Sequence, residues 1–266
     1  MTVIQAALLG VVQGLTEFFP ISSSAHLILV RGLLGWQVGS AELAFDVACH
    51  LGTLFAVLTY FREDVERLAV AAPGALTGRT GESARVGRLI IAATVPIALA
   101  GWLFADLVEH LRQPGIAAVA LVVGALVMLA AERIGSRGRA SASLSTMEAV
   151  GLGCAQAVAL VPGVSRSGAV ITVAMLVGLT RSEAARFSFL IGIPAILGAG
   201  VRVAWTLGAS GMAEQTTVLL VGFVASGVVG YFAIAVLLWY VERHSLDPFA
   251  YYRLVVAAAL GIWLAA

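Results

Sequence analysis

The strongest constraint on the fold of this chain is a series of apolar runs, each about as long as a bilayer core is thick. A helix needs roughly 20 apolar residues to cross the hydrocarbon core. Six runs approach that length, at about 45–61, 89–108, 116–131, 187–205, 217–241 and 250–265. Of the 266 residues, 60% are hydrophobic and 12% charged, against roughly 25% charged in soluble domains. The sequence therefore predicts an all-α polytopic membrane protein, with residues 1–266 forming a single integral membrane domain.

The charge of the chain argues against nucleic acid as a partner. The formal net charge is +1 and no basic tract is present, so we expect no nucleic acid and expect membrane lipids as the surroundings. The first apolar run is not followed by a cleavage-like site of small residues, so we do not expect a removable signal peptide.

Two further apolar segments, 3–35 and 149–178, are interrupted by polar breaks. The first breaks at Pro20 and the serines that follow it, and the second breaks at Pro162 and Gly163. A proline removes a backbone donor, and unpaired polar groups are not tolerated against lipid. Each break must therefore be buried in protein or line a wet cavity.

The arginines indicate how these broken segments lie, because cytoplasmic loops carry an excess of basic residues. If both segments are re-entrant helical hairpins, twelve arginines share one side and three lie on the other, with Arg166 set aside. If both segments span, the split is nine to six. The twelve are Arg62, Arg67, Arg79, Arg85, Arg88, Arg133, Arg137, Arg139, Arg181, Arg186, Arg243 and Arg253. We therefore predict two re-entrant hairpins, with 62–88 and 132–148 as cytoplasmic loops.

The order of segments repeats after residue 148, which indicates a duplicated architecture. Gly10 to Ser22 and Gly153 to Ser165 are both twelve positions, with a glutamine at the fourth residue of each stretch. We expect two repeats, about 1–135 and 145–266. Three crossings per repeat invert the second relative to the first, place both termini on the outer face and let the hairpin tips meet near mid-membrane.

The two tips offer groups that bind anions. Helices that restart after the breaks present unpaired N–H groups and positive dipole ends. Arg166 adds a guanidinium suited to phosphate oxygens, and Gly163 and Gly168 permit close approach of a ligand to the backbone. We expect a phosphate-handling site.

The first tip adds groups that support hydrolysis. Glu17 follows Gln13 by four residues, so both lie on one helix face; Glu17 would act as a base, pair with Arg166 or help to hold a divalent ion. His26 stands three residues beyond Ser23, and a hydroxyl with a base is the minimum for attack on phosphorus. Structural alternatives remain open at this point: the serines as helix caps, His26 as an interior histidine, and Glu17 with Arg166 as a buried structural pair.

A further pair of polar residues lies four positions apart on the first spanning run. Asp46 and His50 would share one face of that helix and would face the same cavity.

At the two polar breaks the chain resembles the bacterial undecaprenyl-diphosphate phosphatase family, also called the bacitracin-resistance protein family. The first motif is (Glu/Gln)-x-x-x-Glu with its following serines and histidine, here Gln13 to His26. The second is Pro-Gly-x-Ser-Arg-Ser-Gly, here Pro162 to Gly168. The resemblance in segment order extends over nearly the whole chain.

The resemblance implies hydrolysis of a polyprenyl diphosphate, undecaprenyl diphosphate, to undecaprenyl phosphate and inorganic phosphate at the outer face of the bacterial cytoplasmic membrane. That reaction recycles the lipid carrier of cell-wall synthesis and confers bacitracin resistance, usually with a divalent cation (Mg²⁺ or Ca²⁺), and a homodimer is left open. The family roles pass to the residues in the matching places, which are Glu17, Ser22, Ser23, Ser24, His26, Ser165, Arg166 and Ser167. Many members have Glu where this chain has Gln13, which puts a metal-ligand role at that position in doubt and leaves Glu17 as the expected metal ligand.

The expected mechanism is attack by Ser23 on the terminal phosphorus, with His26 or Glu17 taking its proton and Arg166 neutralising the phosphate. His26 as the nucleophile and direct attack by water are the rival assignments. A lipid-phosphate transporter or flippase is the alternative function, because inverted repeats around broken helices are typical of transporters.

Overall fold

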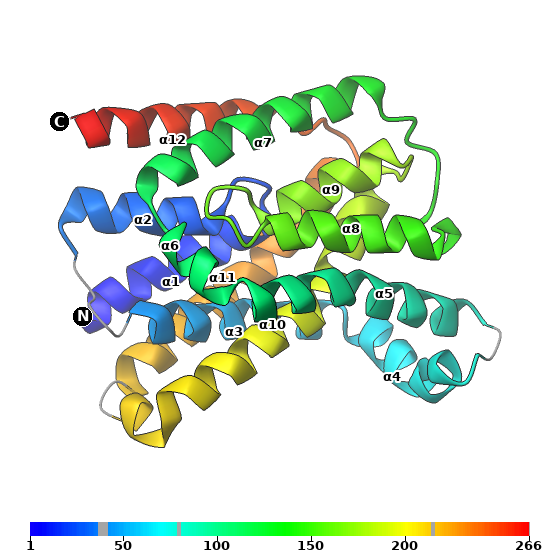
Figure 1. Ribbon diagram of the computed structural model, residues 1–266, viewed down its shortest axis with the longest axis horizontal. Coiled ribbons are helices and arrows are strands. Elements are labelled where there is room, and N and C mark those ends of the chain that lie inside the picture. The colour runs from blue at the N-terminus through cyan, green and yellow to red at the C-terminus, as the bar shows by residue number, and fades with distance from the viewer. Residues whose placement is uncertain (37–41, 79–80, 214–215, 266) are drawn as a thin grey trace.

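The computed structural model describes residues 1–36, 42–78, 81–213 and 216–265, which form a bundle of helices (Figure 1). Within these ranges the only other regular features are a 3-10 turn at Ser141–Ser143 and an isolated bridge between Arg139 and Leu179. The all-helical fold predicted from composition is confirmed for the described part of the chain. Arg79, counted above among the loop arginines, lies outside the described residues.

The helices follow the predicted order of apolar segments. Their bounds are α1 (Val3–Phe18), α2 (Ser23–Leu34), α3 (Glu42–Tyr60), α4 (Arg62–Leu76), α5 (Glu82–Leu103), α6 (Ala105–His110), α7 (Pro114–Ile134), α8 (Thr146–Val158), α9 (Arg166–Leu176), α10 (Arg181–Ala213), α11 (Thr216–Val241) and α12 (Asp247–Ala265).

Six of the described helices are long and apolar enough to cross a membrane. They are α3, α5, α7, α10 over Arg181–Arg202, α11 and α12. Each contains or overlaps one of the six predicted runs, so that prediction is confirmed. Large apolar side chains point outward from them, including Trp102 at 82% and Trp205 at 88% exposure, as expected for surfaces that face lipid.

The prediction that 62–88 is a loop is wrong. Its first half is the helix α4, and α5 begins at Glu82. Glu63 and Asp64 lie in the first turn of α4, where their negative charges interact favourably with the helix dipole. Asp64 also accepts a hydrogen bond from Arg186 of α10 at 2.7 Å. A search for apolar runs misses this helix because its first turns are charged and the apolar stretch that follows is short and contains Pro73.

The two broken segments form helical hairpins that approach from opposite ends of the molecule. In Figure 1 the α1–α2 pair enters from the end that holds both termini, and the α8–α9 pair enters from the other end; their tips lie near the centre. The four helices have 16, 12, 13 and 11 residues, and all are shorter than the roughly 20 residues of a bilayer span.

Small residues seat each hairpin on a long helix of the other half. α1 packs on α11 and α8 packs on α5. Gly10 lies against Gly222 and Ala225, and Gly153 lies against the backbone of Ala93, with no room for a Cβ at either glycine. These close approaches fix how far each hairpin reaches into the bundle.

One of the twelve arginines counted on the cytoplasmic side is buried in the bundle. Arg253 is inside α12 and is 1% exposed, so it is not an exposed loop charge of the kind that the count relies on. The last apolar run begins earlier than hydropathy suggests, at Asp247, which places Arg253 in its second turn. Without Arg253 the sequence count is eleven to three, so the prediction of re-entrant hairpins is unchanged.

Candidate active site

The chain takes the same unusual backbone path at both breaks. Ser22 precedes α2 with φ 73°, and Ser165 precedes α9 with φ 67°. A non-glycine residue in this left-handed region costs free energy and persists only where its surroundings impose it. The hydroxyls of Ser22 and Ser24 are 3.1 Å apart, and those of Ser165 and Ser167 are 3.3 Å apart. The breaks therefore match in conformation as well as in sequence position.

The two tips touch, as the sequence predicts. The Gly163 N–H donates to Ser24 Oγ at 3.3 Å. Ser167 Oγ donates to the carbonyl oxygens of Glu17 and Phe19, each at 3.3 Å. Within the second tip, Ser165 Oγ accepts from the N–H of Gly168 at 3.1 Å and so caps α9.

Glu17 is the centre of the contacts between the tips. Its Oε1 accepts from Arg166 Nη2 at 2.8 Å, and its Oε2 accepts from Ser23 Oγ at 2.8 Å and from Gln13 Nε2 at 3.0 Å. The Glu17 side chain is only 5% exposed. A carboxylate from one hairpin thus joins a hydroxyl of its own hairpin to a guanidinium of the other.

His50 of α3 also reaches this cluster. Its Nδ1 lies 3.0 Å from Gln13 Nε2 and 3.4 Å from Glu17 Oε2. The His50 side chain is 37% exposed, so it marks the open side of a buried cluster. Asp46, expected beside it, instead accepts from Arg31 at 2.6 Å, so only one member of that pair faces the site.

The structure commits both ring nitrogens of His26 to partners other than Ser23. Nδ1 lies 2.7 Å from the carbonyl oxygen of Ser22, and Nε2 lies 2.9 Å from the hydroxyl of Tyr252. A carbonyl only accepts, so Nδ1 carries a hydrogen, and in the neutral ring Nε2 accepts from Tyr252. His26 stands three residues beyond Ser23 but does not hydrogen-bond to it, because its imidazole is turned toward α12.

Tyr252 was missed by the sequence reasoning. Its ring stacks on that of His26 at a centroid distance of 5.5 Å and an angle of 8°. The only signal in the sequence was a hydroxyl next to Arg253 in an apolar run. Neither residue belongs to a motif.

Arg166 is held against α10 by a second feature that was missed. Its Nη1 is buried and has no hydrogen-bond partner among the described residues. Gly192 of α10 faces this nitrogen, and a Cβ at that position would overlap Nη1. A helical glycine in a long apolar run gave no sequence signal for this role.

A divalent cation fits this cluster only in part. No group of three or more His, Cys, Asp or Glu side chains suited to a metal is found within the described ranges. Gln13 Oε1 is buried without a partner beside Glu17. Mg²⁺ sites commonly use one or two protein oxygens plus substrate phosphates, and Gln13 with Glu17 fits that arrangement rather than a cage made of protein alone.

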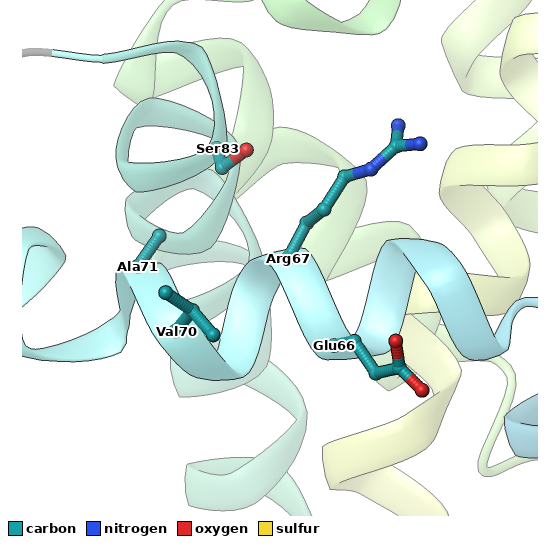
Figure 2. A pocket seen from close by; sticks show the side chains of 5 residues that line it. All are labelled: Glu66, Arg67, Val70, Ala71 and Ser83. Carbon is teal, nitrogen blue, oxygen red and sulfur yellow. The ribbon is translucent and has the colours of Figure 1, made fainter.

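An open surface hollow lies away from the tips, between α4 and α5. Figure 2 shows its lining by Glu66, Arg67, Val70, Ala71 and Ser83. None of these residues belongs to either hairpin, and we assign the hollow no part in the chemistry.

Comparisons with a family model and with individual proteins agree with each other. A family model described as bacitracin resistance protein BacA matches residues 6–259. A protein of Rubrobacter xylanophilus named undecaprenyl-diphosphatase is 49% identical over 269 residues, covering 99% of each chain. Proteins of the same name from Teredinibacter turnerae and Geobacter metallireducens are 42% and 41% identical, covering 98% and 99% of this chain and 99% of each relative.

Proposed function

The chain belongs to the bacitracin resistance protein family, and we propose that it is a membrane hydrolase that converts undecaprenyl diphosphate to undecaprenyl phosphate and inorganic phosphate. One observation carries the assignment of chemistry. The two oxygens of Glu17 bind the Arg166 guanidinium and the Ser23 hydroxyl, each at 2.8 Å. A base, a nucleophile and a phosphate-binding cation are thereby assembled from both tips.

Binding of the diphosphate draws on groups that already face one another. Arg166 presents donors in a planar fork that matches phosphate oxygens. The first N–H groups of α2 and α9 have no partner within their own helices, and helix N-termini favour anions. These fixed donors would stabilise the charge that develops on the phosphoryl oxygens, which is commonly the largest contribution to catalysis.

Ser23 is the best-placed nucleophile. Its Oγ forms a bond to the terminal phosphorus while Glu17 Oε2 takes the proton, and the bond from that phosphorus to the bridging oxygen breaks. The electron pair leaves on undecaprenyl phosphate. Water then attacks the phosphorus of the phosphoserine and the bond from that phosphorus to Ser23 Oγ breaks. Glu17 returns its proton to Ser23 Oγ and takes the proton of the attacking water, and inorganic phosphate leaves. His26 is a weaker candidate because both of its ring nitrogens are engaged.

A divalent cation would be held by Gln13 and Glu17 together with the diphosphate. When bound it would supply positive charge against the phosphate oxygens. Gln13 contributes through its unpartnered Oε1, which a glutamine shares with the glutamate found at that position in many family members.

We place the two hairpins as re-entrant elements of an inverted repeat, about 1–135 and 145–266. The packing of the two hairpins supports the proposal. The first helix of each hairpin packs on a long helix of the other half, α1 on α11 and α8 on α5. The matched serines with positive φ support it further. We place both termini and the site opening at the outer face of the bacterial cytoplasmic membrane, where hydrolysis would return the lipid carrier to cell-wall synthesis.

The decisive measurement is phosphate release from a long-chain polyprenyl diphosphate by purified protein in detergent. We expect release without any gradient, reduction by a chelator, and a loss of about 10³-fold or more in Ser23→Ala. Ser83→Ala, in the surface hollow, is the matched control. Mass mapping of a trapped phosphoryl group should identify Ser23. Intact protein that releases no phosphate but binds the lipid would overturn the hydrolase and favour a carrier.

A further inference from the structure

Arg253 is a buried guanidinium with no acidic partner. It lies in α12 and is 1% exposed. No Asp or Glu side chain of the described residues pairs with it, and all five of its hydrogen-bond acceptors are backbone carbonyl oxygens. Burying a charge without an opposite charge costs free energy. Such a residue requires a reason beyond simple packing.

Three of those acceptors belong to the two hairpin tips. Nη1 donates to Pro20 O at 3.4 Å, and Nη2 donates to Gly163 O at 3.1 Å and to Val164 O at 3.0 Å. Pro20 and Gly163 lie at the two breaks that open the substrate-binding helices. One side chain thus bonds to both breaks at once.

The other two acceptors fix the guanidinium itself. Nε donates to Leu121 O and Nη2 to Ala120 O on α7, each at 3.3 Å. Two glycines make the room it needs: a Cβ at Gly124 would overlap Nη2, and one at Gly168 would lie 3.0 Å from Nη1. The guanidinium is therefore held in place from a third element that belongs to neither tip.

These bonds also set the direction of nearby donors. In a trans peptide the C=O of one residue and the N–H of the next point in opposite directions, and the described chain has no cis peptide. Because Val164 C=O points to Arg253, the N–H of Ser165 points away from it. The Ser165 N–H finds no acceptor among the described residues, so it stays available at the start of α9 beside Arg166.

We propose that Arg253 is a positioning residue of the diphosphate site. It holds the two tips in register, aims the peptide N–H before α9, and adds an unneutralised positive charge behind an anion site. The proposal rests on the hydrolase function proposed above. It assigns Arg253 no contact with the reacting atoms.

The test compares Arg253→Lys and Arg253→Met with wild type, using kcat, KM and hydrogen exchange of residues 20–24 and 161–168. Lysine keeps the charge but loses the planar fork, so we expect KM within about threefold and kcat lower by about tenfold or more. Methionine loses both, so kcat should fall further and KM should rise. In both variants the backbone amides of residues 20–24 and 161–168 should exchange hydrogen faster than in wild type.

Several results would overturn the proposal. A lower unfolding temperature with normal kcat and KM in either variant would show a purely structural role. If Arg253→Met does not fold, an unchanged kcat in Arg253→Lys overturns it equally. The control is Arg243→Met, because Arg243 is an exposed arginine just after α11.

A second measurement separates this proposal from the proposed hydrolase function. Inorganic pyrophosphate should raise the unfolding temperature of wild type and raise it less in Arg253→Met, whether or not phosphate is released. If pyrophosphate stabilises wild type but wild type releases no phosphate, the hydrolase function is rejected and the role of Arg253 is not. Equal stabilisation of both proteins would reject the role of Arg253.

Discussion

Arg166 Nη2 donates to Glu17 Oε1 at 2.8 Å, although the two residues lie 149 positions apart in the chain. Their side chains are 16% and 5% exposed. Replacing a buried ion pair with apolar residues is commonly neutral or stabilising, so stability alone does not explain this pair. We therefore attribute the pair, which joins the two polar breaks inside an apolar bundle, to the diphosphate site proposed above.

Arg166→Ala should reduce kcat/KM by at least about 10²- to 10³-fold, the usual loss when one charge-stabilising donor is removed. Arg166→Lys should restore little, because an ammonium does not reproduce the planar fork. Phosphate release by purified variants measures both effects, with folding checked by thermal unfolding. Residual hydrolysis within tenfold of wild type would reject the role of Arg166.

Gly192→Ala should lower activity because the added methyl occupies the space of Arg166 Nη1. We expect kcat/KM to fall by about tenfold or more, since a shift of about 1 Å in a catalytic group is costly. Gly198→Ala is the matched control on the same helix, because a Cβ there meets nothing within 4 Å. Equal activities of the two alanine variants would contradict this reading of Gly192.

Tyr252→Phe removes the hydroxyl that donates to His26 Nε2 at 2.9 Å. We expect a loss of about 1 kcal/mol in stability but less than a tenfold loss in kcat/KM, because Glu17 rather than His26 bonds to Ser23. The neighbouring Tyr251→Phe, at an exposed position, should change neither quantity. A loss in kcat/KM above about 100-fold would instead support His26 as the base or nucleophile.

Glu148, at the start of α8, provides a pH-dependent contribution to stability. Hydrogen bonds from Arg139 at 2.7 and 3.0 Å lower the pKa of Glu148 to about 2, from an ordinary 4.5. A carboxyl whose pKa is lowered by folding contributes fully above its ordinary pKa, and the contribution is lost as pH falls toward the folded pKa. The stabilisation should therefore be lost between about pH 4.5 and pH 2.

Thermal unfolding of Glu148→Gln in detergent tests this contribution. Wild type should unfold at a higher temperature than the variant at neutral pH, and the difference should shrink as pH falls below about 4.5. Glu63→Gln, an exposed site, should show no such change with pH. A difference that stays constant down to about pH 3 would contradict the assignment.

The spans and the meeting of the tips were predictable because each follows from a strong local signal. Apolar runs of spanning length have few alternatives to a helix, and a Pro with polar residues cannot face lipid. The segment holding α4 was not predictable in this way, since its first turns are charged and the apolar stretch after them is far shorter than a bilayer span. Its helical structure follows instead from favourable charges in its first turn and an ion pair to α10.

The outer parts of the site were less accessible to sequence reasoning. Tyr252, Gly192 and Arg253 come from spanning helices whose residues carry no motif, and their roles depend on which face each helix turns to the tips. His50 and Asp46 share a helix face in the sequence, yet only His50 reaches Glu17. The difference arises because Arg31 of α2 binds Asp46 and occupies its carboxylate.

The long separation of Glu17 and Arg166 also bears on how the protein is made. The carboxylate leaves the ribosome well before its guanidinium partner exists, and Arg253 follows only near the C-terminus. A chain shorter than 166 residues therefore lacks the partner of Glu17, and a chain shorter than 253 residues lacks the arginine that bonds to both tips. Full alignment of the two tips is therefore reached only after the last helix has been inserted.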